Sequence, residues 1–146
     1  MGANFPWIER GSDHDATDDG AHANGGYLHL QPGNHFLGGG LWMATKPRLD
    51  AFRQAIVDDP ERVRAALEEA GFLAAFGPVR SQETLKRNPP GWPADHPMAD
   101  LFRYKDIVFG RRLDDAEVYS RNLPDIVADG FLAAMPVFRF LATLRG

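Results

Sequence analysis

The chain contains no cysteine, and this absence sets the first limits on its chemistry. Disulfide bonds, thiolate metal sites and a thiol nucleophile are excluded, because each requires a cysteine sulfur. No apolar run reaches the ~18 residues that a membrane-spanning helix needs, and the first residues lack a basic segment followed by an apolar one. A length of 146 residues is typical of one domain. We therefore expect a single domain over residues 1–146, soluble and cytoplasmic, with no membrane partner.

Basic residues are also few, with 16 Lys and Arg against 20 Asp and Glu, a net charge of −4. Nucleic-acid modules are usually strongly basic, because their affinity comes from neutralising phosphates and releasing counterions. The stretch 80–112 is a local exception, with seven basic and four acidic residues around Trp92, Phe102 and Tyr104. An excess of three charges is small, so nucleic acid is disfavoured as a partner.

Motifs for cofactors and metals are missing as well. Gly38-Gly39-Gly40 is not followed by the Lys-Ser/Thr of a phosphate loop and lacks the spaced glycines of a dinucleotide fold. These glycines instead predict a bulge or a close approach by another backbone. Residues 11–26 hold no large apolar side chain, which predicts a long solvated loop. Its aspartates and histidines are cation ligand types, but a calcium loop needs a fixed acid register that is absent. We therefore predict no metal and no cofactor.

A β-hairpin is expected over Tyr27–Trp42. Pro32-Gly33-Asn34 suits a three-residue loop, with Pro32 at position i+1 and Asn34 in the left-handed region. In this register His29 and His35 share one face of the hairpin, although a change of one residue in the loop would reverse the facing.

Helical periodicity follows the hairpin. Apolar spacing predicts helices over residues 47–58 and 60–70, the second capped by Asp59 and ended by Gly71. A third helix is expected over residues 123–144, kinked or split by Pro136. Short helices are predicted near Pro97 and after Asp114, which forms a capping box with Glu117.

These elements together predict an α+β fold. A small antiparallel sheet, made of the hairpin and strands near Phe5 and Ile107, packs against the three longer helices.

The stretch from Thr84 to Pro97, called the connector below, carries the main site candidates. Its prolines hold a basic pair, an aromatic ring and an Asp-His pair on one stiff segment. Lys86 and Arg87 could bind a phosphate or carboxylate group, and His96 beside Asp95 could act as a general base. The structural alternative is that Asp95 and His96 cap a helix and that Trp92 covers the core.

Three functions follow from these candidates. The first is binding of a small anionic ligand by connector residues 85–97, with Lys86, Arg87 and Trp92, together with the hairpin face near His29 and His35. The second is an enzyme that uses His96 and Asp95 as acid and base. The third is a non-catalytic interaction module. Two histidines do not make a metal site, so His29 and His35 are not predicted to hold zinc.

Three segments carry a resemblance to a known family: residues 26–33 with 38–42, residues 49–61, and residues 85–105. Over most of residues 4–144 the chain resembles a bacterial family known as domain of unknown function 2461. The resemblance implies an α+β fold and no assigned chemistry. The family's upstream Arg-Asp…Arg-Phe…Lys…Pro-Tyr-Lys signature is not in this sequence, so we predict that the chain is the C-terminal portion of a family member. A missing N-terminal segment would expose a sheet edge or an apolar face, which predicts a homo-oligomer that covers it.

Overall fold

A computed structural model describes residues 2–6 and 24–145 of the chain. Its sheet has four strands in the order β1-β2-β3-β4, and each strand pairs antiparallel with its neighbour in sequence. The strands are β1 (Gly2–Pro6), β2 (Asn24–His29), β3 (His35–Leu41) and β4 (Ile107–Leu113). The predicted hairpin and the strands near Phe5 and Ile107 are confirmed.

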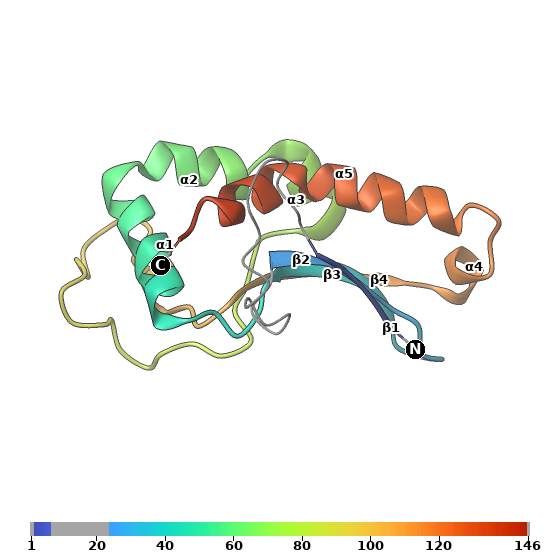
Figure 1. Cartoon of the computed structure of the whole chain (residues 1–146), viewed down its shortest axis with the longest axis horizontal. Coiled ribbons are helices and arrows are strands. Elements are labelled where there is room, and N and C mark those ends of the chain that lie inside the picture. Colours follow the sequence, from blue (N-terminus) through green and yellow to red (C-terminus); the bar gives the residue numbers. More distant parts are fainter. Residues whose placement is uncertain (1, 7–23, 146) are drawn as a thin grey trace.

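Helices cover one side of this sheet, as Figure 1 shows. They are α1 (Lys46–Asp58), α2 (Pro60–Leu67), α3 (Ala70–Phe76), the 3-10 helix η2 (Ala99–Arg103), α4 (Asp115–Val118) and α5 (Leu123–Ala142). The predicted α+β class is therefore confirmed. No helix in the described ranges is both long and apolar enough to cross a membrane.

The second predicted helix ends earlier than expected. Asp59 caps α2, and its side chain accepts the Arg62 backbone N–H as predicted. However, α2 stops at Leu67, and the Glu69 side chain accepts the Phe72 backbone N–H to begin α3. Gly71 thus lies in the first turn of a new helix instead of ending an old one. Gly77, with φ +74°, is the residue that ends α3.

The last helix forms the centre of the packing. α5 runs unbroken from Leu123 to Ala142, so Pro136 does not split it. Its residues Ala134, Val137 and Phe138 are buried, and the Phe138 ring lies 5.5 Å from the Phe109 ring of β4. The core therefore lies between α5 and the helix-facing side of the sheet.

The glycine run in β3 lies where backbones come close. A Cβ added at Gly38 would lie 2.6 Å from the Phe109 carbonyl oxygen, and one at Gly39 would lie 2.9 Å from the Phe138 ring. The predicted close approach by another backbone is confirmed at Gly38.

The long loop predicted over residues 11–26 is wrong at its C-terminal end. Asn24, Gly25 and Gly26 belong to β2, and the buried Asn24 side chain donates to the Phe138 carbonyl oxygen at 2.9 Å. Backbone pairing with β3 makes these residues a strand even though none of them has a large apolar side chain. The rest of the predicted loop, with its candidate cation ligands, lies outside the described residues.

Candidate functional site

The hairpin register separates the two candidate histidines. His29 pairs with Phe36 across the β2–β3 ladder, and their rings stack 4.8 Å apart. His35 precedes Phe36 and so points to the opposite face, because side chains alternate along a strand. The prediction that His29 and His35 share a face is wrong.

The turn explains this difference in register. The Asn34 backbone N–H donates to the Gln31 carbonyl oxygen at 2.8 Å, which closes a tight turn around Pro32 and Gly33. Gly33 has φ +79°, whereas Asn34 is not in the left-handed region. A Pro-Gly pair at the two central positions is typical of a type II turn. The loop is thus one residue shorter than predicted, and that change reverses the facing.

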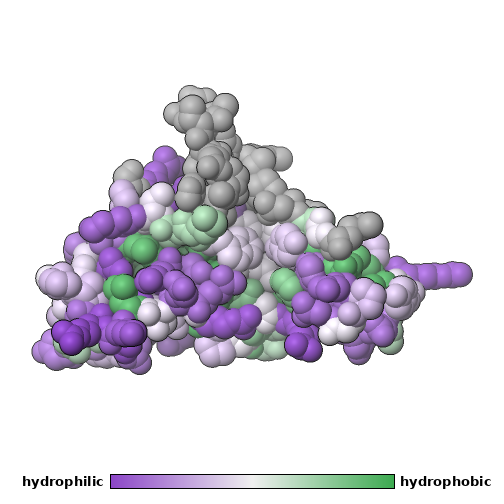
Figure 2. Space-filling model, turned by 90° about the horizontal axis from the view of Figure 1, so that it is seen from below, coloured by the Kyte–Doolittle hydropathy of each residue, from purple (hydrophilic) through white to green (hydrophobic). Residues whose placement is uncertain are grey.

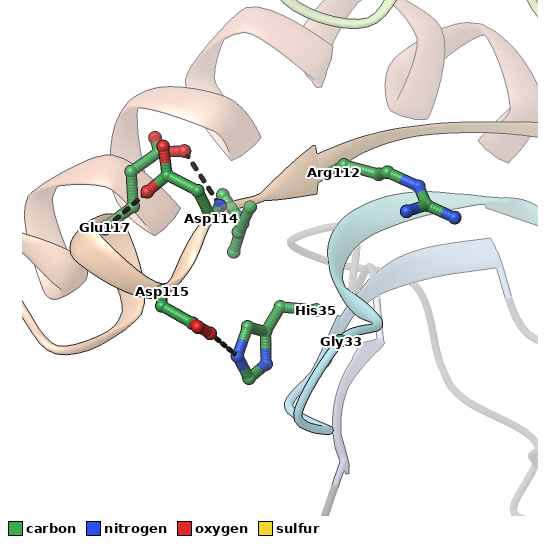
Figure 3. A pocket seen from close by; sticks show the side chains of 7 residues that line it. Gly33, His35, Arg112, Asp114, Asp115 and Glu117 are labelled. Carbon is green, nitrogen blue, oxygen red and sulfur yellow. Dashed lines mark hydrogen bonds and ion pairs between the residues drawn. The ribbon is translucent and has the colours of Figure 1, made fainter.

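His35 is held by two hydrogen bonds and is 5% exposed. Its Nδ1 accepts the Gln31 backbone N–H at 3.0 Å, and its Nε2 lies 2.9 Å from Oδ1 of Asp115 in α4. Because Nδ1 is an acceptor, the proton resides on Nε2, which donates to Asp115. Figure 3 shows this contact. The imidazole therefore ties the hairpin turn to α4.

A hollow of about 410 Å³ opens beside this contact. It is lined by Gly33, His35, Arg112, Leu113, Asp114, Asp115 and Glu117. Asp114 and Glu117 form the predicted capping box of α4, and Glu117 also accepts from Arg111 at 2.7 Å. No group of three metal-ligating side chains occurs within residues 2–6 and 24–145. The carboxylates of this hollow are thus occupied in holding α4 and the turn.

Hydrogen bonds fix the connector on both sides of its basic pair, Lys86 and Arg87. Leu85 exchanges two hydrogen bonds with Arg103, one from its backbone N–H and one to its carbonyl oxygen, both at 2.7 Å. The Asn88 side chain donates to the Trp92 carbonyl oxygen at 2.7 Å. Between these anchors, Lys86 and Arg87 are exposed and make no hydrogen bond or ion pair with the described part of the chain.

The remaining connector candidates have structural contacts. The Trp92 ring lies 5.8 Å from the buried Phe102 ring and packs against the core, as the structural alternative predicted. The His96 ring also packs on Phe102, and its Nδ1 accepts the Met98 backbone N–H at 3.0 Å. Asp95 is exposed and is not hydrogen-bonded to His96.

The connector and the hairpin turn lie at opposite ends of the sheet, as Figure 1 shows. Bridges from Arg80 to Val108 and from Thr84 to Tyr104 place the connector at the start of β4, whereas His35 pairs with Leu113 at its end. Five strand residues at ~3.4 Å each separate these positions by roughly 17 Å. The structure therefore does not bring the connector together with the two histidines, and a ligand site at either place stays a prediction.

A further group of side chains was missed from the sequence. Tyr27, Phe36, Trp42 and Arg112 share with His29 the sheet face that points away from the helices, and the Tyr27 ring lies 6.4 Å from the Trp42 ring. The alternation of these residues along the strands was visible in the sequence. Only the correct hairpin register shows that they lie together.

The four-stranded meander sheet and the α5 layer that covers it define a small α+β domain. A family model described as a conserved hypothetical protein, DUF2461, matches residues 6–140. The chain belongs to this family. No curated protein and no solved structure matches it. The expected N-terminal truncation stays a prediction.

Proposed function

We propose that this domain binds a small anionic ligand through Lys86 and Arg87. The observation that supports the proposal is the contrast within the connector: both cations are exposed without a partner among the described residues, while Leu85 and Asn88 beside them are fixed. A guanidinium binds carboxylate or phosphate through two parallel hydrogen bonds, and an ammonium adds a point charge. Anchored neighbours reduce the entropy lost when such a ligand binds.

The surrounding charges favour an anion. Residues 80–105 contain five basic and three acidic side chains, although the whole chain has a net charge of −4. One of these acids, Glu83, pairs with Lys105 at 3.4 Å and not with the basic pair. Trp92 lies on the same segment with its ring partly exposed, and we include it as a flanking contact to the ligand.

A catalytic role for His96 and Asp95 has less support. Nδ1 of His96 already accepts the Met98 backbone N–H, and Asp95 makes no hydrogen bond to the ring. A binding function requires neither of these groups.

A nuclear magnetic resonance titration with inorganic phosphate and with citrate, at constant ionic strength, tests the proposal. We expect saturable shifts of the backbone amides of residues 85–88. The double variant Lys86→Ala/Arg87→Ala should weaken binding by about ten-fold or more, which corresponds to ~1.4 kcal/mol. Arg121→Ala removes another exposed cation and serves as the matched control, with binding unchanged. Unchanged affinity in the double variant, or no shift with either anion, contradicts the proposal.

The predicted homo-oligomer remains a separate proposal. Its support is the place of β1 at the edge of the sheet, where β2 is its one partner strand among residues 2–6 and 24–145. An edge strand offers unpaired backbone groups to a second copy. Analytical ultracentrifugation over a wide range of protein concentration should then show a mass that rises to that of a dimer. A mass that stays monomeric over the whole range contradicts it.

A further inference from the structure

The sheet face that points away from the helices carries a cluster of aromatic rings at its hairpin end. His29 and Phe36 stack with centroids 4.8 Å apart and planes 22° apart. The Tyr27 ring contacts both, 6.1 Å from His29 at 23° and 5.9 Å from Phe36 at 38°. All three side chains are partly exposed. Cross-strand aromatic pairs stabilise a sheet, and partly exposed rings also offer faces and edges against which a further planar ring can pack.

An exposed guanidinium, that of Arg112, lies next to this aromatic cluster. Arg112 pairs with Phe36 across the β3–β4 ladder, so both side chains leave the same face. Arg112 is exposed and makes no hydrogen bond or ion pair with any residue in the described ranges. Its neighbour Arg111 points to the other face, where it binds Glu117. Arg111 is therefore paired within the fold, whereas Arg112 is exposed and has no hydrogen-bond or ion-pair partner among the described residues.

The nearby carboxylates do not neutralise Arg112. Figure 3 shows its guanidinium pointing away from Asp115 and His35, which contact each other. Asp114 and Glu117 cap α4 from the same side as Asp115. Arg112 thus places a positive charge beside the aromatic cluster.

The surface favours a small ligand over a protein partner. Figure 2 views the side of the molecule opposite the helices, and among its coloured atoms hydrophilic side chains interrupt the hydrophobic ones. Protein-binding faces usually present a larger continuous apolar patch. The glycines farther along β3, Gly38 and Gly40, are buried, which confines the accessible part of the face to the hairpin end.

We propose that His29, Phe36 and Arg112 form a binding site for a planar aromatic molecule that carries a carboxylate or phosphate group. The ring of the ligand packs against the aromatic cluster, and its anionic group pairs with the guanidinium of Arg112. Arginine also contributes a cation–π contact when a ring lies against it. This site is separate from the one proposed at Lys86 and Arg87.

Titrations of the full chain, followed through backbone amide shifts, test this site. Adenosine 5′-monophosphate and 1-naphthoate serve as probes with ring and anion, adenosine as the ring alone, and inorganic phosphate as the anion alone. We expect both complete probes to shift the amides of His29, Phe36 and Arg112 at millimolar concentration. The two partial probes should shift them far less, because each lacks half of the interaction.

Variants separate this site from the connector. Arg112→Ala should weaken both complete probes by about ten-fold, with no loss of folding because the side chain is exposed and has no described partner. Phe36→Leu should weaken the binding of both complete probes to a similar extent. The amide spectrum of this variant verifies that the fold persists. Lys86→Ala/Arg87→Ala should leave these shifts unchanged. The proposal is overturned if neither complete probe moves the three amides, if Arg112→Ala leaves affinity unchanged, or if phosphate alone reproduces the shifts.

Discussion

Nε2 of His35 donates to Oδ1 of Asp115 at 2.9 Å and so joins the β2–β3 turn to the first turn of α4, 80 residues away in sequence. The imidazole is 5% exposed and the Asp115 side chain is 72% exposed. The other ring nitrogen accepts the Gln31 backbone N–H. A buried ring thus adds a side-chain link between the turn and α4, beside the end of the β3–β4 ladder where His35 pairs with Leu113.

This arrangement predicts unequal effects for its two residues. His35→Ala removes two hydrogen bonds and leaves a cavity, so we expect it to lower the free energy of unfolding by about 2–3 kcal/mol. Asp115→Ala should cost less than ~1 kcal/mol, because its exposed carboxylate exchanges one partner for water. Urea denaturation of both variants measures the difference. Equal losses in the two variants would show that the ring contributes nothing beyond its hydrogen bond to Asp115.

The helix ends show which parts of the fold the sequence could predict. Caps act over three or four residues, so the roles of Asp59 and of the Asp114–Glu117 pair were readable from local chemistry. Gly71 was misassigned because the Glu69 cap and the burial of Phe72 outweigh a glycine stop signal. These outcomes depend on tertiary packing, which a single sequence does not display.

The candidate site was less predictable than the fold for the same reason. A choice between a two-residue and a three-residue turn decides whether His35 joins His29 or opposes it. The contacts that engage His96 and Trp92 both run to Phe102, whose position follows from the packing of η2. By contrast, the solvent exposure of Lys86 and Arg87 agrees with their charge and with the prolines that follow them.

The Glu69 cap predicts an acid-sensitive component of stability. The pKa of the Glu69 carboxyl is lowered from its ordinary value, first by the hydrogen bond from the Phe72 backbone N–H and then by that from Gly71. A carboxyl whose pKa is lower in the folded state stabilises the fold above its unfolded pKa, and this stabilisation is lost as pH falls through the folded value. Glu69→Gln should therefore flatten the decline of the melting temperature below about pH 5.

Melting curves of the two proteins between neutral pH and about pH 3 provide the measurement. Glu68→Gln is the matched control, because Glu68 is an exposed neighbour whose side chain caps no helix. Parallel acid profiles for the wild-type protein and Glu69→Gln would refute a role for this carboxylate.

Gly40 and Gly110 lie on the sheet face that points away from the helices, and we expect them to differ in how well they tolerate an added methyl group. Gly40 has φ +124°, and a Cβ there would overlap the Ile107 carbonyl oxygen. Gly110 would place its Cβ 3.4 Å from the nearest atom, the Leu37 carbonyl oxygen, which is ordinary contact. We expect Gly40→Ala to cost of order 1–3 kcal/mol through backbone strain, while Gly110→Ala costs less than ~0.5 kcal/mol. Denaturant unfolding compares them, and a reversed order would contradict the strand geometry described above.

Arg53 predicts a link between the core and the connector. Its side chain is buried, with Nε donating to the Phe102 carbonyl oxygen and Nη1 donating to Asp50, both at 2.9 Å. Phe102 in turn packs against Trp92 and His96. Arg53→Met keeps the aliphatic bulk but leaves both acceptors without this donor, so we expect a loss of about 2–4 kcal/mol.

The same variant should also loosen the connector, because η2 loses the bond that holds it to α1. Amide hydrogen exchange at Leu85 and Trp92, whose N–H groups are hydrogen-bonded in the wild-type protein, should accelerate more than exchange in β3. Arg64→Met is the control, since Arg64 forms a surface ion pair with Glu61 at 3.1 Å and lies away from η2. Uniform acceleration across β3 and the connector would mean that Arg53 stabilises the domain globally and does not position the connector.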